Sequence, residues 1–332
     1  RYAEADARMA DFARAHAELP ETALAQAWLA SFAGDHPGAL EILRVGEARF
    51  PSDPRLPTLA AHVHFLRDDR AAMQAALARA FALAPDYHLA WYEQGLFHQF
   101  SEPDGAAAIA AFDRALDARA GFAPARMQRA QVYYDLGDYR AAVRDFEAAL
   151  AADPGSATIH AAYGIVCAYL GRLPDAQRLL ERAQELDADE PYAALGLAFL
   201  DLLRGAPQAG VERTLKAAVA NPELPGVDWF LAAGTYQAGD YARTRQALAT
   251  ARKRDPDDPI PDLIGSVSAV DNFEAGEAIR LARDGFDKTL RAKSFAVDTL
   301  ANARGGSATL GQAYSNLGLD AWGGYYSLLA FD

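Results

Sequence analysis

The sequence predicts an all-α protein built as a solenoid of stacked antiparallel helix pairs. Alanine is abundant while Ile and Val are sparse in a chain of 332 residues that is 51% hydrophobic and 23% charged. This usage favours helices over strands. In addition, most of the chain repeats itself with a period of 34 residues. Repeats of this size pack on their neighbours and form solenoids.

The repeat is clearest in residues 123–156. Positions 8, 11, 15, 17, 20, 24, 27 and 32 of this unit hold Ala130, Tyr133, Gly137, Tyr139, Ala142, Phe146, Ala149 and Pro154. Small residues at positions 8 and 20 let two helices approach, and larger residues at 11, 17 and 24 fill the space between them. Gly at position 15 permits a tight turn with a positive φ, and Pro at 32 ends the second helix. This pattern resembles the tetratricopeptide repeat, which implies a right-handed superhelix of paired helices A and B.

The same frame continues on both sides of this unit and gives seven consecutive units. They are 20–53, 54–87, 88–122, 123–156, 157–190, 191–224 and 225–258. Unit 88–122 is one residue longer than the others, and we expect the extra residue in the turn at 101–105. Since no single helix pair buries its apolar face, stability is expected to come from stacking.

The signature weakens at both ends of the chain. After residue 258 the regular spacing fails, and 259–303 is expected to be an irregular, lengthened unit with helices near 261–270 and 273–290. Residues 304–332 match a truncated unit, and residues 1–19 match the second helix of another. Because both ends cut through repeats and are apolar, we expect the chain to be part of a longer protein.

The C-terminal segment carries a second resemblance. Residues 307–332 (SATLGQAYSNLGLDAWGGYYSLLAFD) are similar to segments of large exported bacterial tetratricopeptide proteins associated with the outer membrane. This resemblance implies a bacterial protein in the periplasm, at the outer membrane or outside the cell, in preference to the cytoplasm.

Charge and composition exclude several classes of partner. The net charge of −13 disfavours nucleic acid and anionic lipid surfaces, because phosphate contacts need clustered Lys and Arg. No stretch of eighteen apolar residues is present, so no helix of this chain is expected to span a membrane. The single cysteine, Cys167, lies at packing position 11 and is expected to be a buried, inert thiol.

No motif in the sequence predicts catalysis, a cofactor or a metal. His62 and His64 lie two residues apart, so they point to different sides of a helix and chelate poorly. The acidic pairs at 68–69 and 257–258 fall between helices, where carboxylates cap helix starts. We therefore expect a protein that is not an enzyme.

The tetratricopeptide resemblance also implies a binding surface. In that family, positions 5, 9, 12 and 13 of helix A line a concave groove, and here these positions are rich in aromatic residues and almost free of Lys and Arg. The candidate partner-binding residues are Trp28, Phe32, His62, Phe65, Tyr92, Leu96, Phe100, Met127, Gln131, Tyr134, Tyr169, Phe199, Trp229 and Tyr236. Family members that clamp a peptide carboxylate use Lys, Arg and Asn there, so a segment with large apolar anchors is the expected ligand.

Three functions fit these features. The leading hypothesis is a protein-interaction scaffold that binds a protein or peptide in the groove. The second is a structural subunit that assembles with itself or coats another complex through its solenoid ends, or whose groove is filled by another part of the same longer chain. The third is a regulatory module of a larger enzyme.

Overall fold

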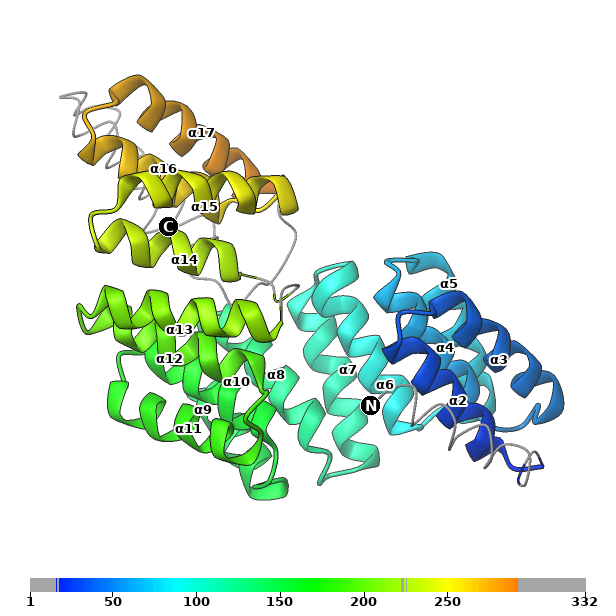
Figure 1. Cartoon of the computed structure of the whole chain (residues 1–332). Helices are drawn as coiled ribbons and strands as arrows, with labels where there is room; N and C mark the ends of the chain where they lie inside the picture. Colours follow the sequence, from blue (N-terminus) through cyan, green and yellow to red (C-terminus); the bar gives the residue numbers. More distant parts are fainter. Residues whose placement is uncertain (1–15, 17, 222–223, 225, 292–332) are drawn as a thin grey trace. The chain divides into compact units, whose positions relative to one another are not determined.

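The structure is a computed structural model that describes residues 16, 18–221, 224 and 226–291. Every regular element within these residues is a helix, and no strand occurs among them. The helices follow one another as pairs, each with a helix A and a helix B (Figure 1). The predicted all-α class is confirmed. The truncated units expected at 1–19 and 304–332 lie mostly or wholly outside the described residues, as does the aromatic tail.

The chain divides into two compact units, of which the first is Arg1–Ala152. Its described helices are α2 (Pro20–Phe32), α3 (His36–Arg49), α4 (Arg55–Leu66), α5 (Arg70–Leu83), α6 (His88–Leu96), the π-helix η1 (Phe97–Ser101), α7 (Gly105–Ala118), α8 (Ala123–Asp135) and α9 (Tyr139–Ala152). Successive helices pack as the pairs α2–α3, α4–α5, α6–α7 and α8–α9. The A helices α2, α4 and α6 contact one another in a row.

The second unit is Asp153–Asp332 and is built in the same way. Its described helices are α10 (Ala157–Tyr169), α11 (Leu173–Leu186), α12 (Pro191–Leu203), α13 (Pro207–Ala220), α14 (Val227–Gln237), α15 (Tyr241–Arg254), α16 (Ile260–Asp271) and α17 (Ala275–Arg291). The A helices α10, α12, α14 and α16 form a row of contacts, and each B helix from α11 to α15 also contacts the A helix that follows it.

Aspartate side chains begin several B helices, because a carboxylate satisfies N–H groups that have no partner within the helix. Asp35, Asp69 and Asp104 each accept a hydrogen bond from the backbone N–H three residues further on, at N–O distances of 2.9, 3.2 and 3.0 Å. At the start of α16, Asp258 accepts a hydrogen bond from the N–H of Ile260 at 2.9 Å. Asp69 of the pair 68–69 thus caps α5 as predicted, whereas Asp258 of the pair 257–258 satisfies one N–H at the start of α16 without being its N-cap.

The turn from helix A to helix B contains a residue with a positive φ in every described pair except α6–α7. Glycine occupies this place in five of the described turns, with φ between 72° and 82°: Gly34, Gly137, Gly171, Gly205 and Gly239. Asp68 takes it between α4 and α5 with a φ of 52°, and Phe273 takes it between α16 and α17 with a φ of 61°. Glycine adopts this conformation without the steric penalty that other L-residues incur.

Paired helices approach closely at the small residues of the repeat. The Phe112 ring of α7 lies directly against Gly95 of α6, which leaves no room for a β-carbon there. In the next pair, Phe146 is fully buried, as are the small residues Ala130 and Ala142. Stacking of such pairs produces a core that runs along each unit, and its burial supplies most of the stabilisation.

The extra residue of unit 88–122 lies in helix A and not, as the sequence suggested, in the turn. After α6 the chain continues as η1, where the N–H of Glu102 donates to the carbonyl of Phe97 at 2.9 Å. This i to i+5 hydrogen bond makes the helix one residue wider per turn and absorbs the insertion. The turn that follows, residues 102–104, is as short as the other A-to-B turns.

The register also continues further than the sequence suggested. α16 ends at Asp271, the turn residue is Phe273 and α17 begins at Ala275. Each of these lies 34 residues after the corresponding feature of the α14–α15 pair. The 34-residue spacing therefore continues through this pair, although Phe273 replaces the signature glycine. The lengthened part of the unit expected up to residue 303 lies outside the described residues.

Candidate functional site

Five aromatic side chains form a continuous row on the A helices of the first unit. Trp28 stacks on Phe32 with ring centroids 5.3 Å apart, and it lies 5.2 Å from His62. His62 lies 6.3 Å from Phe65, and Phe65 lies 6.0 Å from Phe100 of η1. We call these five residues the aromatic ladder. It joins three successive A helices along one row of side chains.

Much of the aromatic ladder is open to solvent. Phe32 is 66% exposed, Phe100 is 41% exposed and Trp28 is 39% exposed. The neighbouring Leu66 is also exposed. Single exposed apolar residues are common, but a contiguous exposed apolar surface is typical of interaction sites.

A buried ion pair supports the middle of the aromatic ladder. Nδ1 of His62 lies 3.1 Å from one carboxylate oxygen of Glu93 and 3.2 Å from the other, and Glu93 is only 7% exposed. Burial lowers the pKa of His62, but the hydrogen bond and the charge of Glu93 outweigh that effect, so the pKa of His62 is raised. The pair fixes the imidazole ring in position between Trp28 and Phe65.

The π-helix η1 places Phe100 in the aromatic ladder. Counted along the sequence, Gln99 would occupy position 12 and Phe100 position 13 of its unit. The extra residue in η1 turns Phe100 to face Phe65, which is at position 12 of the preceding unit. Gln99 is turned inward, is fully buried, and neither atom of its amide has a hydrogen-bond partner among the described residues. The repeat pattern alone gives no sign of this rotation.

Other candidate groove residues of the first unit are packed in the interior. Tyr92 lies 6.0 Å from Phe112 and 5.4 Å from Phe122, and burial raises its pKa to about 12. Three further candidates are also buried: Leu96, Met127 and Tyr134. Gln131 is half-buried. These five side chains are left out of the surface proposed below, because neighbouring helices cover them wholly or in part.

The remaining four candidates belong to the second unit, where they make contacts with one another or with nearby rings. Tyr169 and Phe199 have ring centroids 4.9 Å apart, and Trp229 stacks on Phe230 at 4.0 Å. The hydroxyl of Tyr236 donates a hydrogen bond to Asp271 at 2.5 Å. All four are half-buried.

No arrangement among the described residues suggests a reaction. Cys167 is fully buried, and burial raises the pKa of its thiol to about 11, so it is a poor nucleophile. No group of three or more His, Cys, Asp or Glu side chains in the described part could hold a metal ion. Within the same residues, none of the helices combines the length and hydrophobicity needed to cross a membrane.

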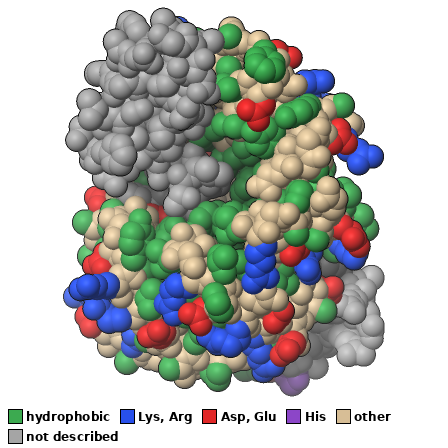
Figure 2. Space-filling model, turned by 90° about the vertical axis from the view of Figure 1, so that its left-hand side faces the viewer, with side chains coloured by type: hydrophobic (Ala, Val, Ile, Leu, Met, Phe, Trp, Pro, Cys, Tyr) green, Lys and Arg blue, Asp and Glu red, His purple; other side chains and the backbone are tan. Residues whose placement is uncertain are grey.

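On the face drawn in Figure 2, the described residues show no concentrated cluster of positive charge. Figure 2 shows one face on which hydrophobic side chains form a broad band and Lys, Arg, Asp and Glu are interspersed. Phosphate-binding surfaces need clustered Lys and Arg.

Comparison with known proteins identifies the repeat. The family model of the tetratricopeptide repeat matches residues 133–198, whereas no curated protein sequence matches the chain. A chain in the crystal structure of the APC/C hetero-tetramer Cut9–Hcn1 is similar in fold, with a TM-score of 0.71 and 13% identity over 91% of this chain and 58% of that chain. The crystal structure of yeast Tom70 gives a TM-score of 0.51 and 15% identity over 90% of this chain and 61% of that chain.

This chain thus spans less than two thirds of either of those proteins. At such low identities the likeness is one of fold. The matched family model identifies residues 133–198 as tetratricopeptide repeats, and the stacked helix pairs of the described residues have the fold of a tetratricopeptide α-solenoid.

Proposed function

We propose that this chain is a non-catalytic scaffold whose aromatic ladder binds an apolar segment of a partner protein. Tetratricopeptide folds are in general scaffolds for protein–protein interaction, and the two similar structures have this fold. The observation that carries the proposal is the exposure of Trp28, Phe32 and Phe100 in one connected row. Aromatic side chains are enriched among the residues that dominate binding energy at protein interfaces.

The charge around the aromatic ladder favours one kind of segment. Its five residues include no Lys or Arg, the carboxylate beneath it is Glu93, and the chain as a whole carries a net charge of −13. The only ladder side chain that can be cationic, His62, already pairs with Glu93, so a carboxylate on the partner would find no free counter-ion there, whereas Lys or Arg would be attracted by the net negative charge of the chain. We infer a segment with large apolar side chains on one face and basic residues beside them.

Two wider hypotheses stay predictions. Export to a bacterial envelope depends on residues 307–332, which lie outside the described part of the chain. A regulatory role requires a catalytic domain elsewhere in a longer protein.

A titration with designed peptides tests the proposal. The probe is a synthetic amphipathic helix with Leu and Phe on one face and Lys on the other, compared with a peptide that has Glu in place of Lys. Fluorescence anisotropy follows binding to the full chain, to the double variant Phe32→Ser/Leu66→Ser and to Val45→Ser. Val45 is the matched control, because it is an exposed apolar residue on the B helix α3.

We expect the basic peptide to bind the wild type and Val45→Ser equally, and the double variant at least about tenfold more weakly. Folding should be preserved, since Phe32 and Leu66 are largely exposed. Equal binding of the double variant would refute the assignment of the surface. Tighter binding of the acidic peptide would refute the inferred chemistry of the partner.

A further inference from the structure

Phe273 occupies a position that is unfavourable for a phenylalanine in two respects, and no ring contact among the described residues compensates for this. Its φ of 61° lies in the left-handed region, which is unfavourable for a bulky side chain. Its side chain is 94% exposed, so almost none of the ring is removed from water. Strained backbone with an exposed apolar side chain is typical of positions kept for a function.

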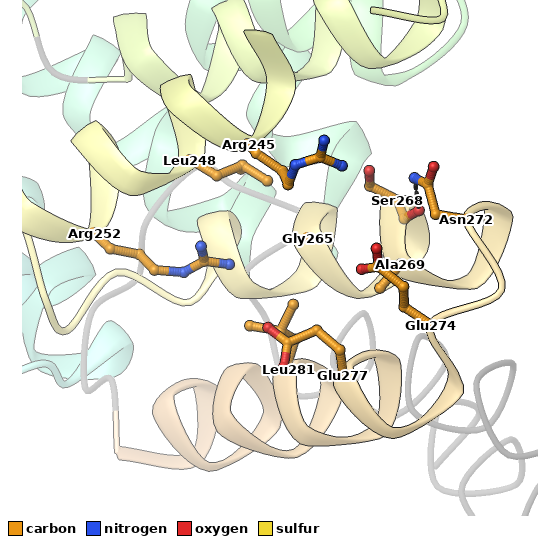
Figure 3. Close-up of a pocket in the computed structure, with 10 residues that line it drawn as sticks. All are labelled: Arg245, Leu248, Arg252, Gly265, Ser268, Ala269, Asn272, Glu274, Glu277 and Leu281. Carbon is orange, nitrogen blue, oxygen red and sulfur yellow. Dashed lines mark hydrogen bonds between the residues drawn. The ribbon is translucent and has the colours of Figure 1, made fainter. Parts of the chain in front are cut away.

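A cleft of about 240 Å³ lies between α15, α16 and α17, and ten of its lining residues are drawn in Figure 3. Asn272 and Glu274, the two neighbours of Phe273 in the chain, both line it. Part of its wall is apolar and is made by Leu248, Gly265, Ala269 and Leu281. For comparison, a cavity of about 150 Å³ is large enough to hold benzene, so this cleft has room for the ring of a phenylalanine.

The cleft also carries two charged groups that have no ion-pair partner among the described residues. Arg245 extends from α15 on one side, and Glu274 lies at the start of α17 on the other. By contrast, the second arginine, Arg252, binds Asp262, and Glu277 binds Arg280. Among the described residues, the lining of the cleft therefore offers one unpaired positive group and one unpaired negative group.

We propose that the surface formed by Phe273 and the cleft between α15, α16 and α17 binds the same surface of a second copy of this chain. Phe273 of each copy enters the cleft of the other, and Arg245 of each copy pairs with Glu274 of the other. A projecting ring beside a cleft, and two open charges of opposite sign, are the features that a two-fold interface requires, because each residue must meet its complement on an identical surface. A different partner would have to supply both complements independently.

The proposed contact is small, so the association is expected to be weak and dependent on concentration. Light scattering coupled to size-exclusion chromatography should show the mass rising from the 35.7 kDa of one chain toward twice that value as concentration increases. Phe273→Gly keeps the turn conformation found in five other turns, and it is expected to weaken self-association at least about tenfold. Val219→Ser is the control, because Val219 is a strongly exposed apolar residue on α13.

Exchanging the charges of Arg245 and Glu274 gives a second, independent test of the proposed dimer. Arg245→Glu and Glu274→Arg should each weaken the dimer, because each places like charges opposite one another. The double variant Arg245→Glu/Glu274→Arg should restore it. A wild type that stays monomeric throughout, a dimer that survives Phe273→Gly, or a double variant that is no better than the single ones would overturn the proposal. The peptide titration of the aromatic ladder is unaffected by any of these results, because it concerns the first unit.

Discussion

Asp135 is the last residue of α8, and its surroundings disfavour the charged form of its carboxyl group. The side chain is half-buried, and its Oδ2 atom is buried without a hydrogen-bond partner among the described residues. Burial raises its pKa from 3.8 to about 8. Its place at the C-terminal end of a helix, where the helix dipole is negative, also disfavours the charged form.

The shift has a definite consequence for the pH dependence of stability. Below about pH 4 the carboxyl group is protonated in both the folded and the unfolded chain. Between pH 3.8 and about 8 the unfolded chain releases the proton while the folded chain retains it, so stability falls as pH rises and becomes constant above about 8. At pH 7 the difference between the two pKa values corresponds to a loss of about 4 kcal/mol relative to acidic pH.

Asp135→Asn removes this titration while keeping the shape of the side chain. The buried amide still has an unmet hydrogen-bonding group, which costs about 1–3 kcal/mol, so we expect a net gain of about 1–3 kcal/mol at pH 7. Urea unfolding between about pH 5 and 8 measures both the gain and the slope, with Asp117→Asn on the exposed face of α7 as the control. A variant that is less stable than the wild type at pH 7, or one with an unchanged slope, would refute the reasoning.

Three further predictions concern single side chains. The raised pKa of His62 means that its pairing with Glu93 stabilises the chain fully below the ordinary pKa of 6.5 and less as pH rises through the raised value, so Glu93→Gln should lower the urea midpoint mainly at acidic pH. Gly95→Ala places a β-carbon on the Phe112 ring and should cost about 1–3 kcal/mol in thermal unfolding, whereas an unchanged melting temperature would contradict the packing. Phe273→Gly should stabilise the monomer by up to about 1 kcal/mol, because relief of the left-handed conformation exceeds the entropy of the added glycine; urea unfolding at low protein concentration checks the sign.

Much of the fold could be predicted because it depends on local chemistry. A glycine at position 15, such as Gly137, permits the positive φ that the turn requires, and this follows from backbone sterics alone. Carboxylates such as Asp69 cap the next helix for equally local reasons. The helix pairs and their spacing follow from these signals together with the alternation of small and large residues.

The candidate site was predicted less completely, since exposure of a groove position depends on what covers it. Tyr92 and Phe32 both fall at groove positions, yet Tyr92 reaches the rings of Phe112 and Phe122 while Phe32 stays open to solvent. The difference lies in side chains of other helices, which the repeat position does not specify. Phe100 was assigned to the surface, but its contact with Phe65 depends on a π-turn that the spacing did not reveal.

Both proposed interaction sites include a place where the chain departs from its own repeat. One inserted residue in helix A creates η1, turns Phe100 toward Phe65 and so extends the aromatic ladder across a third helix. One replaced glycine puts the exposed ring of Phe273 beside a cleft. Residues that fit the repeat are constrained by stacking, because every unit must present the same surfaces to its neighbours. A solenoid can therefore change its binding properties at such departures with little change to the stack, and at Phe273 the conflict with the repeat pattern is itself the signal by which the site can be found.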